Sequence, residues 1–101
     1  MKEYRFLPPA EEELTEASLY YETASSGLGQ EFLDDLQRTV DVLRERPQLG
    51  RPVGHSLRQA TFRRFPFLLI YAEEPDQIVV VAVAHQRWRP GYWRSRERSG
   101  R

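Results

Sequence analysis

An almost unbroken apolar run from Ile78 to Ala84 constrains the fold of this chain more than any other feature of its sequence. A strand with one face in water alternates apolar and polar residues, whereas a strand that is buried on both faces does not. The run is far shorter than the roughly 20 apolar residues that a membrane helix needs. We therefore predict a central strand of a sheet, buried on both of its faces.

Two helices are predicted ahead of this strand. Pro9 suits a first helical turn, and Glu11-Glu12-Glu13 suit the positive end of the helix dipole as solvated side chains. Ser25-Ser26-Gly27 ends this helix, because glycine readily takes the left-handed conformation of a helix cap. A second helix is predicted from about Leu28 to Glu45, and the short connection makes the pair an antiparallel hairpin. The apolar stripes are Ala10, Leu14, Ala17, Tyr21 and Ala24 in the first helix, and Phe32, Leu36, Val40 and Leu43 in the second.

Three further strands are predicted from alternating or apolar segments. They span Lys2 to Leu7, Leu57 to Arg64 and Phe67 to Tyr71, with a loop at 47–54 and a turn at 74–77. Residues 89–98 are expected to form a short terminal helix. The predicted fold class is α+β, with one domain over residues 1–101. In it a small antiparallel sheet carries the helical hairpin on one face, in the order strand–helix–helix–strand–strand–strand.

The net charge of zero hides an uneven distribution along the chain. Residues 1–50 contain five Lys or Arg and eleven Asp or Glu, whereas residues 51–101 contain ten Arg and four Asp or Glu. Every basic residue after position 50 is arginine, the side chain best suited to paired hydrogen bonds with phosphates and carboxylates. One interpretation is a basic working surface with nucleic acid or an acidic protein segment as its partner. The other is that both halves simply present solvated charge.

The sequence lacks the residue patterns of most catalytic and cofactor sites. It has no cysteine, and His55 and His85 form no metal-ligand pattern. Gly27-Leu28-Gly29 lies between two helices rather than after a strand, so it does not indicate a phosphate-binding loop. The first residues lack the apolar stretch of a signal peptide. We therefore expect a cytoplasmic protein with neither metal nor cofactor and with no membrane association.

Residues 84–96, here called the basic–aromatic segment, combine both tryptophans of the chain with several arginines. Such side chains stack on bases and neutralise phosphates, and they also dominate the hot spots of protein interfaces. Arg63 and Arg64 lie at another strand end, which an antiparallel sheet readily brings next to this segment. Tyr92 and Trp93 have a purely structural alternative, in which they dock the segment onto the sheet.

Several short motifs resemble, in order and spacing, the RelE/ParE family of toxins over nearly the whole chain. They are Pro9 to Leu14, Tyr20-Tyr21, Gly27-Leu28-Gly29-x-x-Phe32, Arg46-Pro47, Arg63 to Tyr71, Val83-Ala84-His85-x-Arg87 and Pro90-x-Tyr92-Trp93-x-x-Arg96. The resemblance implies the toxin of a type II toxin–antitoxin system, of the plasmid-stabilisation type. It also implies growth inhibition, and a hetero-oligomeric resting state in which a cognate antitoxin covers the basic face.

The family has two mechanisms, and the first is enzymatic. Members similar to RelE enter the ribosome and cleave messenger RNA, which requires a base, cations for the developing phosphate charge and an acid for the leaving oxygen. For this metal-independent endoribonuclease activity, the candidate catalytic residues are Arg64, His85, Arg87 and Tyr92. Histidine is the side chain that titrates near neutral pH, although His85 at a strand end has the alternative role of a hydrogen bond to backbone.

The second mechanism needs only a shaped surface, because members similar to ParE poison DNA gyrase without cutting nucleic acid. Candidate contacts to the target or the antitoxin are Arg63, Trp88, Arg89, Trp93 and Arg94. Nucleolytic members tend to carry lysines between the second helix and the sheet, whereas this chain has no lysine beyond Lys2. The stretch from Arg64 to Tyr71 is also more similar to the ParE branch. We therefore predict a ParE-like inhibitor of DNA gyrase, with a RelE-like ribosome-dependent mRNA endonuclease as the alternative.

Overall fold

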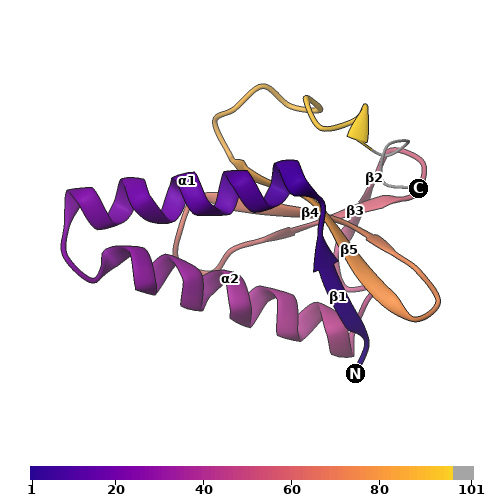
Figure 1. The fold of residues 1–101 in the computed structure, drawn as a ribbon. Coiled ribbons are helices and arrows are strands. Elements are labelled where there is room, and N and C mark those ends of the chain that lie inside the picture. Colours follow the sequence, from indigo (N-terminus) through magenta and orange to yellow (C-terminus); the bar gives the residue numbers. More distant parts are fainter. Residues whose placement is uncertain (97–101) are drawn as a thin grey trace.

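A helical hairpin and a five-stranded sheet make up the fold (Figure 1). The computed structural model describes residues 1–96. Along the chain the elements are β1 (Glu3–Phe6), α1 (Pro8–Ala24), α2 (Leu28–Glu45), β2 (Arg51–Val53), β3 (Leu57–Thr61), β4 (Phe67–Glu73) and β5 (Gln77–His85). The predicted α+β class, with two helices followed by a run of strands, is confirmed.

The last strand, β5, lies inside the sheet, in the order β1-β5-β4-β3-β2. It pairs antiparallel with β4, and the remaining pairs β4–β3 and β3–β2 are antiparallel too. At the other edge, β1 pairs with β5 in parallel, from Glu3 opposite Gln77 to Phe6 opposite Val80. The sheet is therefore antiparallel except at this edge. Every residue from Ile78 to Ala84 is buried, which confirms the prediction for the apolar run.

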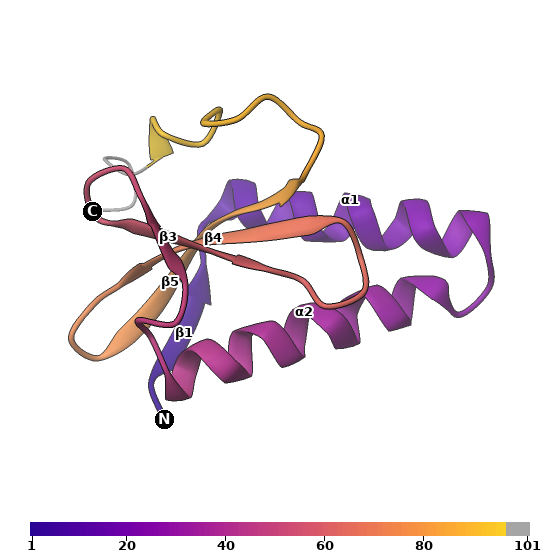
Figure 2. The same cartoon turned by 180° about the vertical axis from the view of Figure 1, so that it is seen from behind.

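The helices α1 and α2 pack against one another and cover one face of the sheet. Proline suits the start of α1 at Pro8, because the first helical turn leaves its N–H groups unpaired. Gly27, with φ of 89°, lets the chain turn between the helices. Glu22 fastens this turn, since its carboxylate accepts hydrogen bonds from the backbone N–H groups of Gly27 and Gly29. The tip of the hairpin projects beyond the sheet, as Figures 1 and 2 show.

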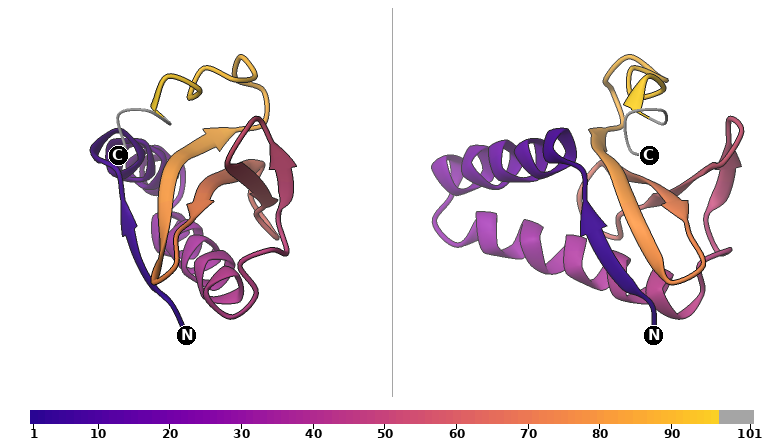
Figure 3. Two further views of the ribbon diagram at one scale, coloured as in Figure 1. Left: turned by 90° about the vertical axis from the view of Figure 1, so that its right-hand side faces the viewer. Right: turned by 45° about the vertical axis from the view of Figure 1, so that its right-hand side comes forward.

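Two apolar clusters lie on opposite faces of the sheet. The first, between sheet and helices, is rich in aromatic rings: the Phe32 ring centre lies 5.0 Å from that of Phe67 and 5.4 Å from that of Phe65. The second contains residues from the other faces of β4 and β5, together with Leu7 and Trp93. Figure 3 shows the basic–aromatic segment, in orange and yellow, on the far side of the sheet from α2. Both faces of the central strand are thus covered.

The elements differ from the predicted ones in several details. The predicted loop at 47–54 contains the edge strand β2, a position at which the sheet tolerates Pro52. The strand predicted from Leu57 to Arg64 ends at Thr61, and residues 63–66 bend. In the region of the predicted terminal helix, residues 90–95 form turns and Arg96 is helical. The last predicted positions, 97 and 98, lie outside the described residues.

Candidate functional site

A buried carboxylate of α2 holds the loop that carries Arg63 and Arg64. Asp35 is only 3% exposed. Its oxygens accept hydrogen bonds from the backbone N–H groups of Arg63 (3.2 Å), Arg64 (2.8 Å) and Phe65 (3.0 Å), and they also contact the Arg38 guanidinium. Bonds to an ionised acceptor are stronger than bonds between neutral groups. The second helix therefore fixes the position of the backbone from which these two arginine side chains project.

The two arginines of this loop have different surroundings. The Arg64 guanidinium forms an ion pair with Glu31 of α2, with 2.8 Å between Nη2 and Oε1, and its Cζ lies 5.4 Å from the centre of the Phe65 ring. Arg63 is exposed, and it pairs with no acidic side chain among residues 1–96. Arg63 is thus open to a partner, whereas Arg64 must leave Glu31 before it binds another anion.

The end of β5 brings His85, Arg87 and Trp88 together beside this loop. The His85 Nδ1 accepts a hydrogen bond from the Arg87 backbone N–H at 3.0 Å, and the His85 carbonyl accepts one from the Trp88 N–H at 3.0 Å. The Gln86 N–H donates to the Pro66 carbonyl at 2.9 Å, which joins the segment to the loop. The predicted proximity of the loop and the basic–aromatic segment is therefore present in the structure.

A glutamate near the start of α1 fastens the basic–aromatic segment. Glu13 accepts hydrogen bonds from the Tyr92 hydroxyl at 2.7 Å and from both terminal nitrogens of Arg96 at 3.0 Å. It also accepts one from the Val83 backbone N–H at 3.0 Å. The Glu13 side chain is only 12% exposed, so the prediction of a solvated carboxylate is wrong at this position. Its partners lie far along the chain, and they withdraw it from water.

A register shift explains why β5 offers polar groups at this point. The pairing of β4 and β5 shifts at Val81, which is left without a partner on β4. On its other side, β1 ends opposite Val80. Beyond that point the Val81 carbonyl accepts a hydrogen bond from Arg96 at 3.1 Å, and the Val83 N–H donates to Glu13. Two side chains thus satisfy the backbone groups that β1 leaves open.

The aromatic residues of the segment divide between interior and surface. Trp93 is 6% exposed and packs in the second cluster. It therefore docks the segment onto the sheet, as its structural alternative predicts. The Tyr92 ring lies 5.8 Å from that of Trp88 between centres. Burial, with the Glu13 carboxylate beside it, raises the pKa of the Tyr92 hydroxyl above its ordinary value. Trp88 is 43% exposed, so it is the indole that a partner can reach.

The remaining arginines of the segment face solvent. Arg87, Arg89 and Arg94 are exposed, and none of them forms an ion pair with a residue in the described part of the chain. The Arg94 guanidinium lies 5.1 Å from the centre of the Trp93 ring. That guanidinium also lies beside Gly54, in the connection between β2 and β3, and so at the opposite end of β3 from the loop of Arg63. Arg87 and Arg89 flank Trp88 in sequence, and with Arg63 they make a basic and aromatic surface.

Two of the four residues predicted for a nuclease are bonded to glutamates of the chain. His85 and Arg87 are neighbours. Arg64 is paired with Glu31, and the Tyr92 hydroxyl is bonded to Glu13. The raised pKa of Tyr92 also makes this hydroxyl a weaker proton donor. Of the four, Arg64 and Tyr92 would have to exchange these contacts before either could act on a phosphate.

An aromatic groove of about 450 Å³ lies between α1 and the end of β5. Of the predicted site residues, it includes His85 and Trp88. Tyr20, on the opposite wall, is 70% exposed. The lining residues are Glu13, Glu16, Ala17, Tyr20, Tyr21, Phe67, His85 and Trp88.

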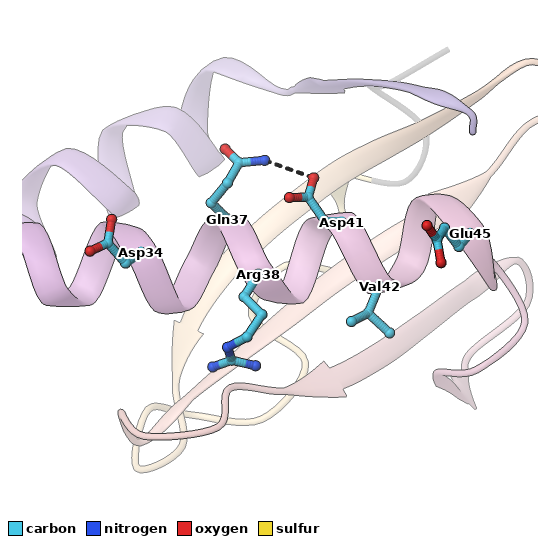
Figure 4. A pocket seen from close by; sticks show the side chains of 6 residues that line it. All are labelled: Asp34, Gln37, Arg38, Asp41, Val42 and Glu45. Carbon is cyan, nitrogen blue, oxygen red and sulfur yellow. Dashed lines mark hydrogen bonds between the residues drawn. The ribbon is translucent and has the colours of Figure 1, made fainter.

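A second hollow, of about 420 Å³, lies on the outer face of α2 (Figure 4). All of its lining residues come from this one helix: Asp34, Gln37, Arg38, Asp41, Val42 and Glu45. The Gln37 amide donates to the Asp41 carboxylate at 3.0 Å, as Figure 4 shows. This hollow contains none of the predicted site residues, and its side chains have the character of a solvated helix face.

Sequence reasoning missed the two carboxylates that position the site. Asp35 lies three residues after Phe32 and directly before Leu36, inside the apolar stripe of α2. A carboxylate inside such a stripe is a signal for a buried acceptor. Glu13 carries no signal of this kind, because it belongs to a run of three glutamates and its partners are 70 or more residues away.

Within residues 1–96, no cluster of three or more His, Cys, Asp or Glu side chains is arranged to hold a metal ion. Neither helix of the described part is long and apolar enough to cross a membrane.

The fold is similar to that of a solved chain described as the chromosomal ParDE TA system from P. aeruginosa, with a TM-score of 0.67. The two share 19% sequence identity over 84% of this chain and 96% of that chain. The family described as the ParE toxin of type II toxin-antitoxin system, parDE, matches residues 4–90. The chain therefore belongs to the ParE toxin family. No curated protein matches its sequence.

Proposed function

We propose that this chain is a toxin that inhibits DNA gyrase by binding it, without cutting nucleic acid. A cognate antitoxin would hold the toxin inactive in a hetero-oligomer. Both partners would act in the cytoplasm, where gyrase works on the chromosome. Membership of the ParE family supports the toxin and antitoxin parts of the proposal.

The observation that carries the binding mechanism is that the Arg64 guanidinium and the Tyr92 hydroxyl are already bonded to glutamates of the chain. A nuclease needs groups that are free to move protons and to stabilise charge on a phosphate. Arg64 is paired with Glu31, and the Tyr92 hydroxyl is held by Glu13 with a raised pKa. Of the four candidate catalytic residues, Tyr92 is therefore held by a largely buried carboxylate, and Arg64 is paired at the surface.

The exposed part of the site suits a protein or protein–DNA partner. Arg63, Arg87 and Arg89 are exposed near Trp88, which has the composition of an interface hot spot. The loop carrying Arg63 is held by Asp35, and the segment carrying the others is held by Glu13. A surface that is already rigid loses less conformational freedom when it binds. Either the target or the antitoxin can use it.

A RelE-like, ribosome-dependent endonuclease is the second candidate, and one observation favours it. His85 and Arg87 are neighbours at the end of β5, beside the loop that carries the exposed Arg63. A histidine flanked by arginines is a chemically adequate start for phosphate transfer. In this case Arg64 would have to exchange Glu31 for the phosphate, which an exposed and screened ion pair permits.

The test is induced expression of the chain in bacteria, with protein synthesis and DNA synthesis followed by label incorporation over the first minutes. The gyrase proposal expects replication to stop first while translation continues. Early loss of translation would overturn it in favour of the endonuclease. If neither protein synthesis nor DNA synthesis changes, both proposed activities are wrong for this chain.

Two sets of variants separate the mechanisms at the same surface. If the toxin only binds, His85→Gln should remain fully toxic, while Trp88→Ala and Arg94→Ala should reduce toxicity. If it cleaves, Arg64→Ala and Arg87→Ala should abolish toxicity while antitoxin binding is retained. Full toxicity of both His85→Gln and Arg87→Ala would eliminate the nuclease.

A further inference from the structure

The first helix carries a strong negative charge that the fold only partly neutralises. Five glutamates and no basic residue occur between Pro8 and Ala24. Glu13 is paired with Arg96, and Glu22 caps the hairpin turn through Gly27 and Gly29. The other three, Glu11, Glu12 and Glu16, are exposed and bond through their carboxylates to nothing in the described part of the chain.

Glu16 differs from its neighbours because it lies on the wall of the aromatic groove. The same wall carries Tyr20, and the facing wall carries Trp88, both exposed. The Trp88 ring is held in place by ring contacts with His85 and Phe67, whose centres are each 6.2 Å from its own. One face of the groove is therefore a fixed aromatic platform with a carboxylate opposite.

An apolar extension continues the groove along α1. A neighbouring hollow of about 430 Å³ shares Glu16 and Tyr20 with it and is completed by Leu19, Thr23 and Ala24. Leu19 is 62% exposed, although leucine is usually buried. Exposed apolar side chains that sit together beside a groove mark a place where another molecule binds.

We infer that this groove binds a cationic side chain, arginine in preference to lysine, presented by a protein partner next to an apolar residue. Arginine stacks on aromatic faces and pairs with carboxylates at the same time. Its guanidinium would lie over Trp88 and Tyr20 and pair with Glu16, while the apolar neighbour would cover Leu19. Nucleic acid is disfavoured here, because the glutamates of α1 repel phosphate.

The molecule would then carry two recognition surfaces of opposite charge. The basic surface around Arg63 and Arg87 takes an acidic partner, whereas the groove takes a basic one. Trp88 borders both, so the two surfaces are contiguous. The inference goes beyond the proposed function and does not depend on whether gyrase or the ribosome is the target.

The test uses the purified full-length chain, labelled with ¹⁵N, and two blocked dipeptides. One contains arginine followed by leucine, and the other contains citrulline, which is neutral and similar in shape, in place of arginine. The chain has two indole N–H signals, from exposed Trp88 and buried Trp93. We expect the arginine dipeptide to shift the Trp88 signal in a saturable way and to leave the Trp93 signal in place. The citrulline dipeptide should bind about fivefold more weakly, or worse.

Matched variants on α1 locate the site. Glu16→Gln should weaken the arginine dipeptide by about fivefold, whereas Glu12→Gln, on the same helix but outside the groove, should leave its affinity unchanged. Tyr20→Ala removes the exposed aromatic ring of the α1 wall and should also weaken binding of the arginine dipeptide. Equal binding of the two dipeptides would overturn the inference, and so would equal losses in Glu16→Gln and Glu12→Gln. Absence of a saturable Trp88 shift, or shifts centred on the acidic face of α2, would overturn it too.

Discussion

At the scale of single residues, Asp35 links the helical hairpin to the loop of the candidate site. Its carboxylate accepts three backbone N–H groups of that loop, from Arg63 to Phe65, and contacts Arg38. A buried acceptor of this kind stabilises the fold only while each donor stays satisfied. A change at this residue therefore affects both the stability of the protein and the shape of the loop.

We expect Asp35→Asn to lower the free energy of unfolding by about 2–4 kcal/mol. The amide places an NH₂ group where the carboxylate accepted hydrogen bonds, so at least one buried N–H loses its acceptor. Urea unfolding measures the change. Asp34→Asn is the matched control, because Asp34 accepts a bond only from Gln30 on the exposed side of α2 and should change stability by less than about 0.5 kcal/mol. Equal losses in the two variants would contradict the role of Asp35.

Buried tyrosines predict a loss of stability in alkali. Burial raises the pKa of Tyr21 and of Tyr71 above the ordinary value of 10.0, and burial together with Glu13 raises that of Tyr92. A folded-state pKa above the unfolded one means that the fold favours the protonated hydroxyl. Each such hydroxyl contributes fully to the free energy of unfolding below pH 10. This contribution is lost as the pH rises through the folded-state pKa of the tyrosine.

Urea unfolding between about pH 8 and 11 should therefore show constant stability at first and a steep fall above pH 10. Tyr71→Phe should reduce this slope by up to about 1.4 kcal/mol per pH unit. Tyr71 is fully buried, and its hydroxyl donates to Pro47 O at 2.6 Å and accepts from Gly50 N–H at 3.0 Å. An unchanged slope in Tyr71→Phe would exclude this residue as a cause.

At the scale of elements, Glu13 connects α1, β5 and the basic–aromatic segment. We expect Glu13→Gln to increase amide hydrogen exchange at Arg94 and Arg96 about tenfold, because a partly buried ion pair is lost and the segment opens more often. Toxicity should fall with it, since the segment carries Trp88, Arg89 and Arg94. Glu12→Gln makes the same change of charge on the same helix but removes none of these contacts. Its amide exchange and its toxicity should therefore match those of the unsubstituted chain. Unchanged exchange in Glu13→Gln would contradict the role of Glu13 in holding the segment.

The helices and the central strand were predictable because their signals are local. The stripe from Phe32 to Leu43 and the run from Ile78 to Ala84 each determine an element and its burial within a short stretch of sequence. The parallel pairing of β1 with β5 was not predictable in this way, because strand partners are chosen through tertiary packing. The edge strand β2 was missed since Pro52 and the surrounding glycines have the composition of a loop.

The composition of the site was predictable, whereas the carboxylates that hold it in position were not. Arginines and tryptophans near the end of the chain indicated a basic and aromatic surface, and most of them are exposed. Trp93 is the exception, because its large apolar ring fills the second cluster. Whether a carboxylate such as Glu13 is solvated or buried depends on groups more than 70 residues away, and no local pattern reports that.

At the scale of the whole molecule, β1 protects the edge of the central strand. We expect deletion of residues 1–6 to produce oligomers or aggregates at concentrations where the intact chain does not form them. The deletion exposes the backbone groups of β5 from Gln77 to Val80, a ready template for another chain. Light scattering measures the effect. Glu3→Gln, an exposed change within the same strand, should leave the oligomeric state unaltered, and an unaltered state in the deletion variant would contradict the protective role.

The pairing of β1 with β5 also sets the order of events when the chain is made. Among the strands, β1 is synthesised first and β5 last. The β1–β5 pair, and with it the complete sheet, cannot form until both are present. Contacts between segments so distant in sequence form late and slowly. A nascent chain would therefore remain without its completed surface until almost all of it has left the ribosome. Until then the edges of the partial sheet stay unpaired and open to other chains.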